Sequence, residues 1–195
     1  NMCLLVWCAA TRNNLDLTGA VFFGGGEPVT PAKVHAILNT GARFIPTYHS
    51  TEAGFMGIGC LTPSSSNDIH IFLDSMAIIS APRHLPEYDV SVEAAYTTLL
   101  LPESPKVMLN VESDDYGSLE YRDCGCPFHD LGYSLHFKDI FSFCKLTGLG
   151  VTLVGNDALK ILEEELPRRF GGSLLDYQLV EEELQDGQTV INLYV

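Results

Sequence analysis

The sequence has few basic residues. It holds 11 Lys and Arg against 25 Asp and Glu, which gives a formal net charge of −14. A protein that binds the nucleic-acid backbone needs clustered Lys and Arg to neutralise phosphates, and no such cluster is present. The composition therefore argues against nucleic acid as a partner. A single bound nucleotide is not excluded, because local loops and Mg²⁺ decide that.

Long apolar runs and several common catalytic motifs are also missing. The apolar stretch Cys3–Ala10 lacks a basic flank and is far shorter than the ~20 residues that span a bilayer. We expect it to form a buried helix and expect no membrane partner. No G-x-x-x-x-G-K-[ST] loop and no G-x-S-x-G elbow occurs. Six cysteines without a secretory signal favour a reducing, cytoplasmic location and free thiols or metal ligands.

Residues 20–54 have the pattern of a strand, a helix and a second strand. The apolar stretch Ala20–Phe23 runs into three glycines, and Thr30 with Pro31 makes a good helix start. The helix ends at Gly41, and Ala42–Ile45 predicts a second buried strand. Two strands joined by one helix are expected to be parallel, so that the loops that follow them face one crevice.

The loop after the second strand is Tyr48–Gly54, which is rich in short polar side chains. Its residue types suit a ligand: Glu52 could bind a divalent cation, Tyr48 could stack on a flat ring, and Ser50 and Thr51 could donate to phosphate. The alternative is an ordinary polar loop with a capping glycine.

The rest of the chain divides into a β-rich block and a smaller terminal region. Residues 55–68 are expected to be a loop or an edge. Turn residues then separate five strand candidates, which predict an antiparallel sheet or small barrel. These are Ile69–Leu73, Ala77–Ser80, Ala94–Leu101, Lys106–Val111 and Ser118–Arg122.

The last 45 residues predict a small α+β domain. Asn156 or Asp157 is expected to cap a helix that Pro167 ends, and the Glu163–Glu165 run is expected to face solvent. Two strands about the Asp186-Gly187 turn, 174–180 and 189–195, predict a hairpin. The fold class is therefore an α/β piece, then a β sheet or barrel, then a small α+β domain.

Two cysteines one residue apart, Cys124 and Cys126, could hold a metal ion but need two more ligands for a tetrahedral site. Cys60 and His70 are the best candidates, because they begin the β block that Cys126 follows. If the block folds back on itself, the four residues would form a structural Cys₃His zinc site. His49, His129 and His136 are alternative fourth ligands. Unrelated thiols and a surface histidine are the simpler interpretation.

Two of these motifs together resemble the adenylate-forming ligase superfamily. Gly25-Gly26-Glu27-Pro28, followed after a helix by Tyr48-His49-Ser50-Thr51-Glu52, is similar to the Gly-Ala-Glu-Pro and Tyr-Gly-x-Thr-Glu motifs of the phenylacetate–CoA ligase branch. This sequence has Gly26 where alanine is usual and His49 where glycine is usual. Some proteins of this branch also show a Cys…His…Cys-x-Cys pattern.

The resemblance implies roles for these residues. The Gly25–Pro28 loop and Tyr48 would enclose adenine, and Thr51 and Glu52 would serve the phosphates and Mg²⁺. Asp115, in the segment that matches the family's Tyr-Arg-Thr-Gly-Asp, would hold ribose through its carboxylate. That segment keeps the aspartate but not the Tyr, Arg and Gly, and an acidic turn is the alternative.

The same resemblance implies a domain division. Residues 1–140 would be the later part of the large nucleotide-binding domain, with an α/β part at 1–54 and a β-rich part at 55–130. Residues 141–195 would hold the hinge and part of the small C-terminal domain. The family's Arg-Asp-Asp hinge motif is missing, so we assign no hinge residue.

The function implied is part of an ATP-dependent ligase. It would adenylate a small carboxylic acid and transfer the acyl group to coenzyme A or a similar thiol, with ATP/AMP, Mg²⁺ and a structural Zn²⁺ as cofactors. A homodimer is compatible with this. We expect the chain alone to be inactive, because it lacks the family's triphosphate loop and catalytic lysine. The alternatives are an acyl-protein synthetase, a zinc-stapled binding or structural module without turnover, and a cysteine hydrolase, which no readable Cys/His/Asn set supports.

Overall fold

The computed structural model describes residues 2–26, 28–85, 89–142, 145–148, 151–184 and 189–195. The chain forms two compact units, Asn1–Phe141 and Ser142–Val195. Unit 1 is built on an eight-stranded mixed sheet with few helices, and unit 2 contains two two-stranded sheets. Each unit is described by itself.

The first part of unit 1 has the strand–helix–strand arrangement that the sequence predicts. Strand β1 (Val21–Gly24) pairs in parallel with β2 (Arg43–Ser50), which confirms the parallel pairing. Helix α2 (Pro31–Leu38) joins them, and its N-cap Thr30 accepts a hydrogen bond from the Lys33 backbone N–H. This cap was also expected, because Thr before Pro satisfies one free amide of the first turn.

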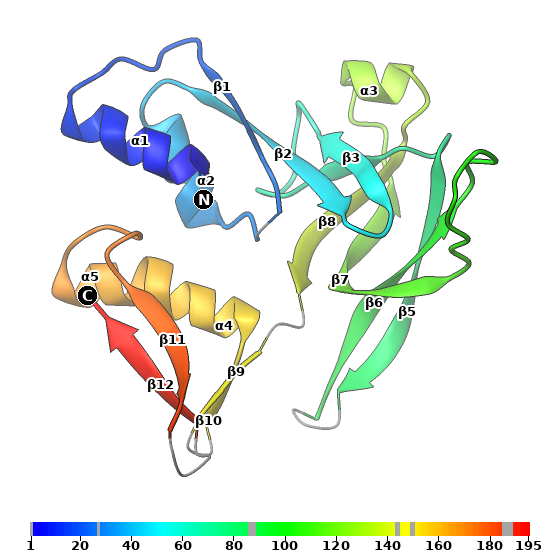
Figure 1. Cartoon of the computed structure of the whole chain (residues 1–195). Coiled ribbons are helices and arrows are strands. Elements are labelled where there is room, and N and C mark those ends of the chain that lie inside the picture. Colours follow the sequence, from blue (N-terminus) through cyan, green and yellow to red (C-terminus); the bar gives the residue numbers. More distant parts are fainter. Residues whose placement is uncertain (1, 27, 86–88, 143–144, 149–150, 185–188) are drawn as a thin grey trace. The chain divides into compact units, whose positions relative to one another are not determined.

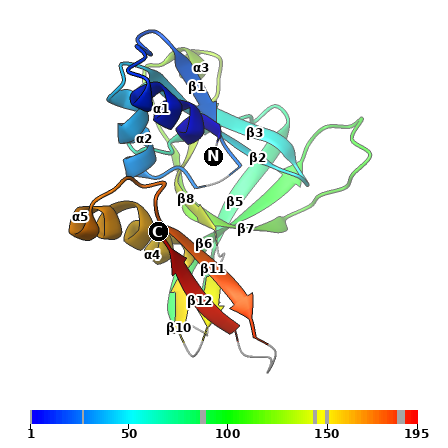
Figure 2. The same cartoon turned by 60° about the vertical axis from the view of Figure 1, so that its left-hand side comes forward.

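Helix α1 (Met2–Arg12) precedes β1, and it lies beside α2 next to β1 and β2 (Figure 1 and Figure 2). The expectation of a buried helix is only partly met. Leu4 and Ala10 are buried, whereas Leu5 and Val6 are 57% and 43% exposed. A single helix packed on one side buries one stripe, so a uniformly apolar sequence still leaves apolar side chains outside. No described helix is long and apolar enough to cross a membrane.

Strand β2 is longer than the sequence indicated. It runs through Tyr48, His49 and Ser50, which we expected in a loop, and turns directly into the antiparallel strand β3 (Gly54–Gly59). Pro46 and Tyr48 are buried on one face of β2 while His49 points outward. This period of two is a strand signal that the polar residue types concealed. The expectation of a loop over 55–68 is therefore wrong for its first five residues.

The remaining strand pairs of the sheet with a defined register are all antiparallel: β3 with β4, β4 with β8, β5 with β6, and β6 with β7. The sheet has the order β1-β2-β3-β4-β8-β7-β6-β5, so β4 and β8 join the early strands to the later ones. The strands not yet bounded are β4 (Ile69–Ile71), β5 (Met76–Leu85), β6 (Val90–Leu99), β7 (Val111–Tyr121) and β8 (Leu135–Ser142).

One expected strand, Lys106–Val111, does not form. Residues 100–110 are a connection between β6 and β7, and Val107 and Leu109 in it are 96% and 74% exposed. An apolar run next to Pro102 and Pro105 lacks the alternation and the ladder partner that a strand needs. Strand β8 (Leu135–Ser142), by contrast, forms where we had predicted no strand.

The core of unit 1 lies against the middle of the sheet. It comprises apolar side chains from six strands, and each large one contributes about 1.5–3 kcal/mol when buried. The cluster is Tyr48, Met56, Ile69, Ile71, Met76, Ile78, Ala95, Leu135 and Phe137. A four-residue helix, α3 (Pro127–Asp130), connects the end of β7 to β8.

Unit 2 contains two hairpins and one helical segment. Strands β9 (Lys145–Gly148) and β10 (Val151–Val154) pair with each other, as do β11 (Gln178–Glu183) and β12 (Thr189–Tyr194). The second pairing confirms the predicted hairpin, although Asp186 and Gly187 lie outside the described residues. The helical segment consists of α4 (Gly155–Lys160), the π-helical η1 (Ile161–Glu165) and α5 (Leu166–Phe170).

The boundaries of this helical segment differ from the expectation. It begins at Gly155, so Asn156 and Asp157 lie inside its first turn. Pro167 does not end it, because the residue sits at the start of α5, where a missing N–H is tolerated. Glu163 is buried, at 9% exposure, so the acidic run is not uniformly solvated.

The close packing of β3 against β4 can be tested by substituting Gly57. A Cβ at this position would overlap the carbonyl oxygen of His70 on β4, and a backbone atom cannot move aside cheaply. We expect Gly57→Ala to lower the free energy of unfolding by about 1–3 kcal/mol, as overpacking does. Ser91→Ala, at an exposed position of β6, is the control and should change it little. Denaturant unfolding measures both, and equal stabilities would contradict this packing.

Candidate functional site

The four predicted metal ligands lie together in unit 1. Cys60 follows β3, His70 lies in β4, and Cys124 and Cys126 lie between β7 and α3. Their ligand atoms are all within 4.8 Å of one another. The antiparallel pairing of β3 with β4, and of β4 with β8, is what brings the two ends of the β block to one place.

His70 is oriented as a ligand through its Nε2 atom. Its Nδ1 lies 2.6 Å from the carbonyl oxygen of Tyr133, and a carbonyl can only accept, so Nδ1 carries the proton. Nε2 then faces Sγ of Cys126 at 3.1 Å and Sγ of Cys124 at 3.7 Å. Burial lowers the pKa of His70, which favours the neutral imidazole that binds metals.

The thiols have different surroundings. Burial acts to raise the pKa of Cys126, but the backbone amides of His129 and Leu61 act to lower it and the net shift is downward. Burial raises the pKa of Cys60 to about 11, against hydrogen bonds from Thr62. Cys126 therefore loses its proton more easily than Cys60, and a bound cation would favour the thiolate form of both.

The set fits a four-coordinate zinc ion. Bond lengths of about 2.3 Å to sulfur and 2.0–2.1 Å to nitrogen in a tetrahedron require S···N separations of about 3.5 Å, close to those seen here. Three thiolates and one imidazole also fill the shell, which is typical of structural zinc. Two of the alternative ligands are placed elsewhere: His49 lies beside Gly25, and His129 faces Asp123 at 3.5 Å. The third, His136, adjoins the cluster and groups with Cys60 and Asp68.

A second polar group adjoins this cluster; it contains His136, which the sequence offered as an alternative ligand, and two residues that sequence reasoning missed, Asp68 and Arg122. His136 Nδ1 donates to Asp68 Oδ1 at 2.6 Å, and the Arg122 guanidinium pairs with the other oxygen of Asp68. Asp68 and His136 are fully buried. Spacing along the chain could have revealed Asp68 and Arg122. Asp68 precedes His70 by two residues and Arg122 precedes Cys124 by two, which places each pair on one face of an extended chain.

A pocket of about 420 Å³ collects three of the other predicted site residues. It brings Thr51 and Glu52, in the turn between β2 and β3, together with Asp115 of β7. The described lining also includes hydroxyl, carboxylate and apolar side chains from the end of β2, from β3 and β6, from the segment before β7 and from the start of β7. They are Ser50, Met56, Thr97, Met108, Val111, Glu112, Ser113 and Asp114.

Lys106 fastens the segment between β6 and β7 to the turn that carries Thr51 and Glu52. Its Nζ donates to the carbonyl oxygens of these two residues at 3.0 and 3.3 Å. No local pattern predicts this contact, because Lys106 and Glu52 are 54 positions apart in the chain.

Tyr48 is in the core and does not line the pocket. It is 8% exposed, its ring packs edge-on against Phe137 at 5.5 Å, and its hydroxyl donates to Asp115 Oδ2 at 2.9 Å. The structure therefore gives Tyr48 a contact that orients Asp115, and leaves little of its ring for stacking on a base.

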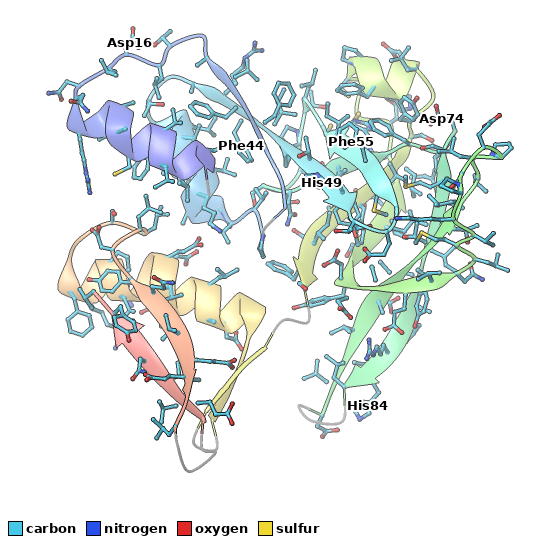
Figure 3. All side chains as sticks on the ribbon, in the orientation of Figure 1. Asp16, Phe44, His49, Phe55, Asp74 and His84 are labelled. Carbon is cyan, nitrogen blue, oxygen red and sulfur yellow. The ribbon has the colours of Figure 1, made fainter. Side chains whose placement is uncertain are left out.

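The glycine loop also lies apart from the described pocket lining. A Cβ on Gly25 would overlap Thr47 and come within 2.8 Å of the His49 ring, so the loop packs on the outward face of β2. Figure 3 shows His49 near Phe55, its partner on β3. Gly26 has a φ of +80°, and the Pro28 carbonyl accepts from Lys33 Nζ at 3.0 Å. Glu27 lies outside the described residues.

The comparisons with known proteins give little. No protein-family model matches the sequence, and no curated protein is similar to it. A solved structure of an acyl-CoA synthetase (AMP-forming)/AMP-acid ligase II-like protein from Dyadobacter fermentans aligns with 95% of this chain, at 15% identity and a TM-score of 0.39. The alignment covers 45% of that protein, so this chain spans less than half of its length. At this TM-score the likeness assigns no function.

The burial of Tyr48 and its hydrogen bond to Asp115 predict that the fold loses stability at high pH. Burial first, and the Asp115 carboxylate second, raise the pKa of Tyr48 far above its usual 10. The folded chain keeps this phenol protonated while the unfolded chain ionises it above pH 10, so stability falls there by about 1.4 kcal/mol per pH unit.

The test compares the unfolding free energy of wild type and Tyr48→Phe from pH 8 to pH 11. Wild type should be the more stable by roughly 1–2 kcal/mol below pH 10, and the difference should shrink as the pH rises further. The control Tyr121→Phe, at a 75% exposed position, should show neither effect. A gap between wild type and Tyr48→Phe that stays constant across pH 10 would contradict the assignment.

Proposed function

We propose that this chain is the nucleotide-binding segment of an ATP-dependent acid–thiol ligase and that a structural zinc ion staples its β-rich part. The proposed reaction is adenylation of a small carboxylic acid followed by transfer of the acyl group to coenzyme A or a similar thiol. The observation that supports it is the pocket shared by Thr51, Glu52 and Asp115. These are the residues that the motif resemblance assigns to phosphate, Mg²⁺ and ribose, and they come from segments about 60 residues apart.

The charge of the pocket defines how a nucleotide would bind. Its described lining has four carboxylates, those of Glu52, Glu112, Asp114 and Asp115, and no Lys, Arg or His. A bare triphosphate would be repelled by these walls, whereas Mg²⁺ bound through Glu52 would offset the charge. Asp115, which accepts from Tyr48, is a carboxylate, the group type that accepts hydrogen bonds from ribose hydroxyls.

In this proposal Tyr48 positions Asp115 and does not stack on adenine. The resemblance assigns stacking to this residue, but burial of its ring argues for the indirect role. The glycine loop keeps its proposed place near the base only through the family resemblance, since no described glycine lines the pocket.

Calorimetric titration with ATP tests the nucleotide pocket. We expect weak binding that requires Mg²⁺, and we expect Asp115→Asn and Glu52→Gln each to weaken it about tenfold or more, which corresponds to 1.4 kcal/mol. Asp89→Asn replaces an exposed aspartate outside the pocket and should bind ATP as wild type does. If ATP gives no heat with Mg²⁺, or if both pocket variants bind normally, the nucleotide proposal is wrong.

A second candidate function is a zinc-stapled binding or structural module without turnover. The specific observation in its favour is that the metal cluster is geometrically complete, whereas the pocket's described lining lacks a cation for phosphates. Zinc binding without ATP binding would favour this candidate over the first.

Metal analysis tests the zinc ion. We expect close to one zinc per chain, with Cys126→Ser losing most of it and melting roughly 5–10 °C lower, because metal binding free energy is folding free energy. Cys8→Ser, in α1 and outside the cluster, is the matched control and should keep the metal. A chain that purifies without metal and melts at the same temperature with added zinc or chelator would leave the cysteines as ordinary thiols.

A further inference from the structure

Arg122 lies between the proposed metal ligands and the buried Asp68–His136 pair. It follows β7 directly, and its backbone N–H donates to the carbonyl oxygen of Ser134 at 3.0 Å, which fixes its position. A single guanidinium nitrogen contacts the Asp68 carboxylate, lies 3.2 Å from His136 Nδ1 and donates to Cys60 Sγ at 3.6 Å. One group therefore connects a metal ligand to a buried carboxylate.

Asp68 is held firmly enough to fix this guanidinium. Its Oδ2 atom also accepts the Ser64 backbone N–H at 2.7 Å and the Ser64 hydroxyl at 3.1 Å, while Oδ1 accepts from His136. The Asp68 side chain is fully buried and that of Arg122 is 25% exposed. A carboxylate that accepts from this many donors is held in place, so it orients Arg122 towards Cys60.

The negative charges of the zinc thiolates and of Asp68 require a cation between Cys60 and Asp68. A divalent ion with three thiolates leaves one net negative charge, and the buried Asp68 carboxylate adds a second within contact of the same group. Burying uncompensated charge is expensive. Among the described residues, Arg122 is the permanently charged side chain recorded in contact with both Cys60 and Asp68.

The same position could otherwise attract a second metal ion. Cys60, Asp68 and His136 place their ligand atoms within 4.8 Å of one another, which is ligand spacing. The guanidinium already contacts all three, so it occupies the place such an ion would take and limits the site to one metal.

We propose that Arg122 is a positioning residue of the metal centre: it holds the Cys60 thiolate in the coordination shell and supplies the fixed positive charge that the buried anions need. This rests on the zinc centre proposed above. Cys60 is the ligand furthest along the chain from Cys124 and Cys126, so holding it keeps the β block closed on itself.

Cobalt substitution and zinc release test this role. Co²⁺ bound to thiolates absorbs in the near ultraviolet in proportion to the number of sulfur ligands, and a chromogenic chelator reports the rate at which Zn²⁺ leaves. We expect Arg122→Met to lower the sulfur-to-cobalt absorption towards that of a two-thiolate site. We also expect it to release zinc faster than wild type, because removing a group that supports a metal ligand typically costs about 10–100-fold in metal affinity.

Arg122→Lys and Arg83→Met complete the comparison. Lysine keeps the charge but lacks the planar fork, so its release rate should fall between those of wild type and Arg122→Met. Arg83 pairs with Glu112 elsewhere on the sheet, and Arg83→Met should release zinc as wild type does.

Each outcome decides the proposal. If Arg122→Met has the cobalt spectrum and zinc release rate of wild type, the positioning role is wrong while the zinc centre stands. If wild type binds neither Co²⁺ nor Zn²⁺, both proposals fail. If Arg122→Met does not fold, Arg122→Lys decides alone: faster release than wild type supports the role, and equal release overturns it.

Discussion

The structure of unit 1 depends on the hydrogen-bonded connection of β3, β4 and β8 in the middle of the sheet. Strand β4 has only three residues, yet it joins the strands before it to those after it. His70 lies in this short strand, with its ring against His136 of β8 at 4.1 Å between centroids. A strand this short forms few backbone hydrogen bonds with its neighbours. The side-chain interactions of its residues therefore contribute a large share of the energy that holds the two parts of the sheet together.

The metal cluster and the pocket are linked to one core. Ile69 and Ile71 flank His70 and are buried in the cluster of side chains that also contains Tyr48 and Met56. Tyr48 reaches from this core to Asp115, and Met56 lines the pocket. Packing in this core therefore sets the geometry of both sites, and loosening the sheet near β4 would disturb Asp115 as well as the thiols.

Local sequence signals predicted the elements that depend on local physics. Thr30 before Pro31 specifies a helix start because a side-chain oxygen can satisfy an amide within the same turn. The same reasoning failed for Tyr48–Ser50, because their polarity suggested a loop while pairing with β3 made them a strand. It also failed for Pro167, since tolerance of a proline depends on where a helical segment is interrupted.

Local patterns in the chain were enough to predict the parallel β1–β2 unit, the terminal hairpin and the four residues whose possible ligand atoms lie within 4.8 Å of one another. Residue type and short spacing carry that information. Only the tertiary structure decided that Asp68, Arg122 and His136 surround Cys60 and that Tyr48 is buried behind Asp115. These contacts join positions 14 to 68 residues apart. Which distant side chains meet depends on the strand order and register of the whole sheet, and no local pattern encodes these.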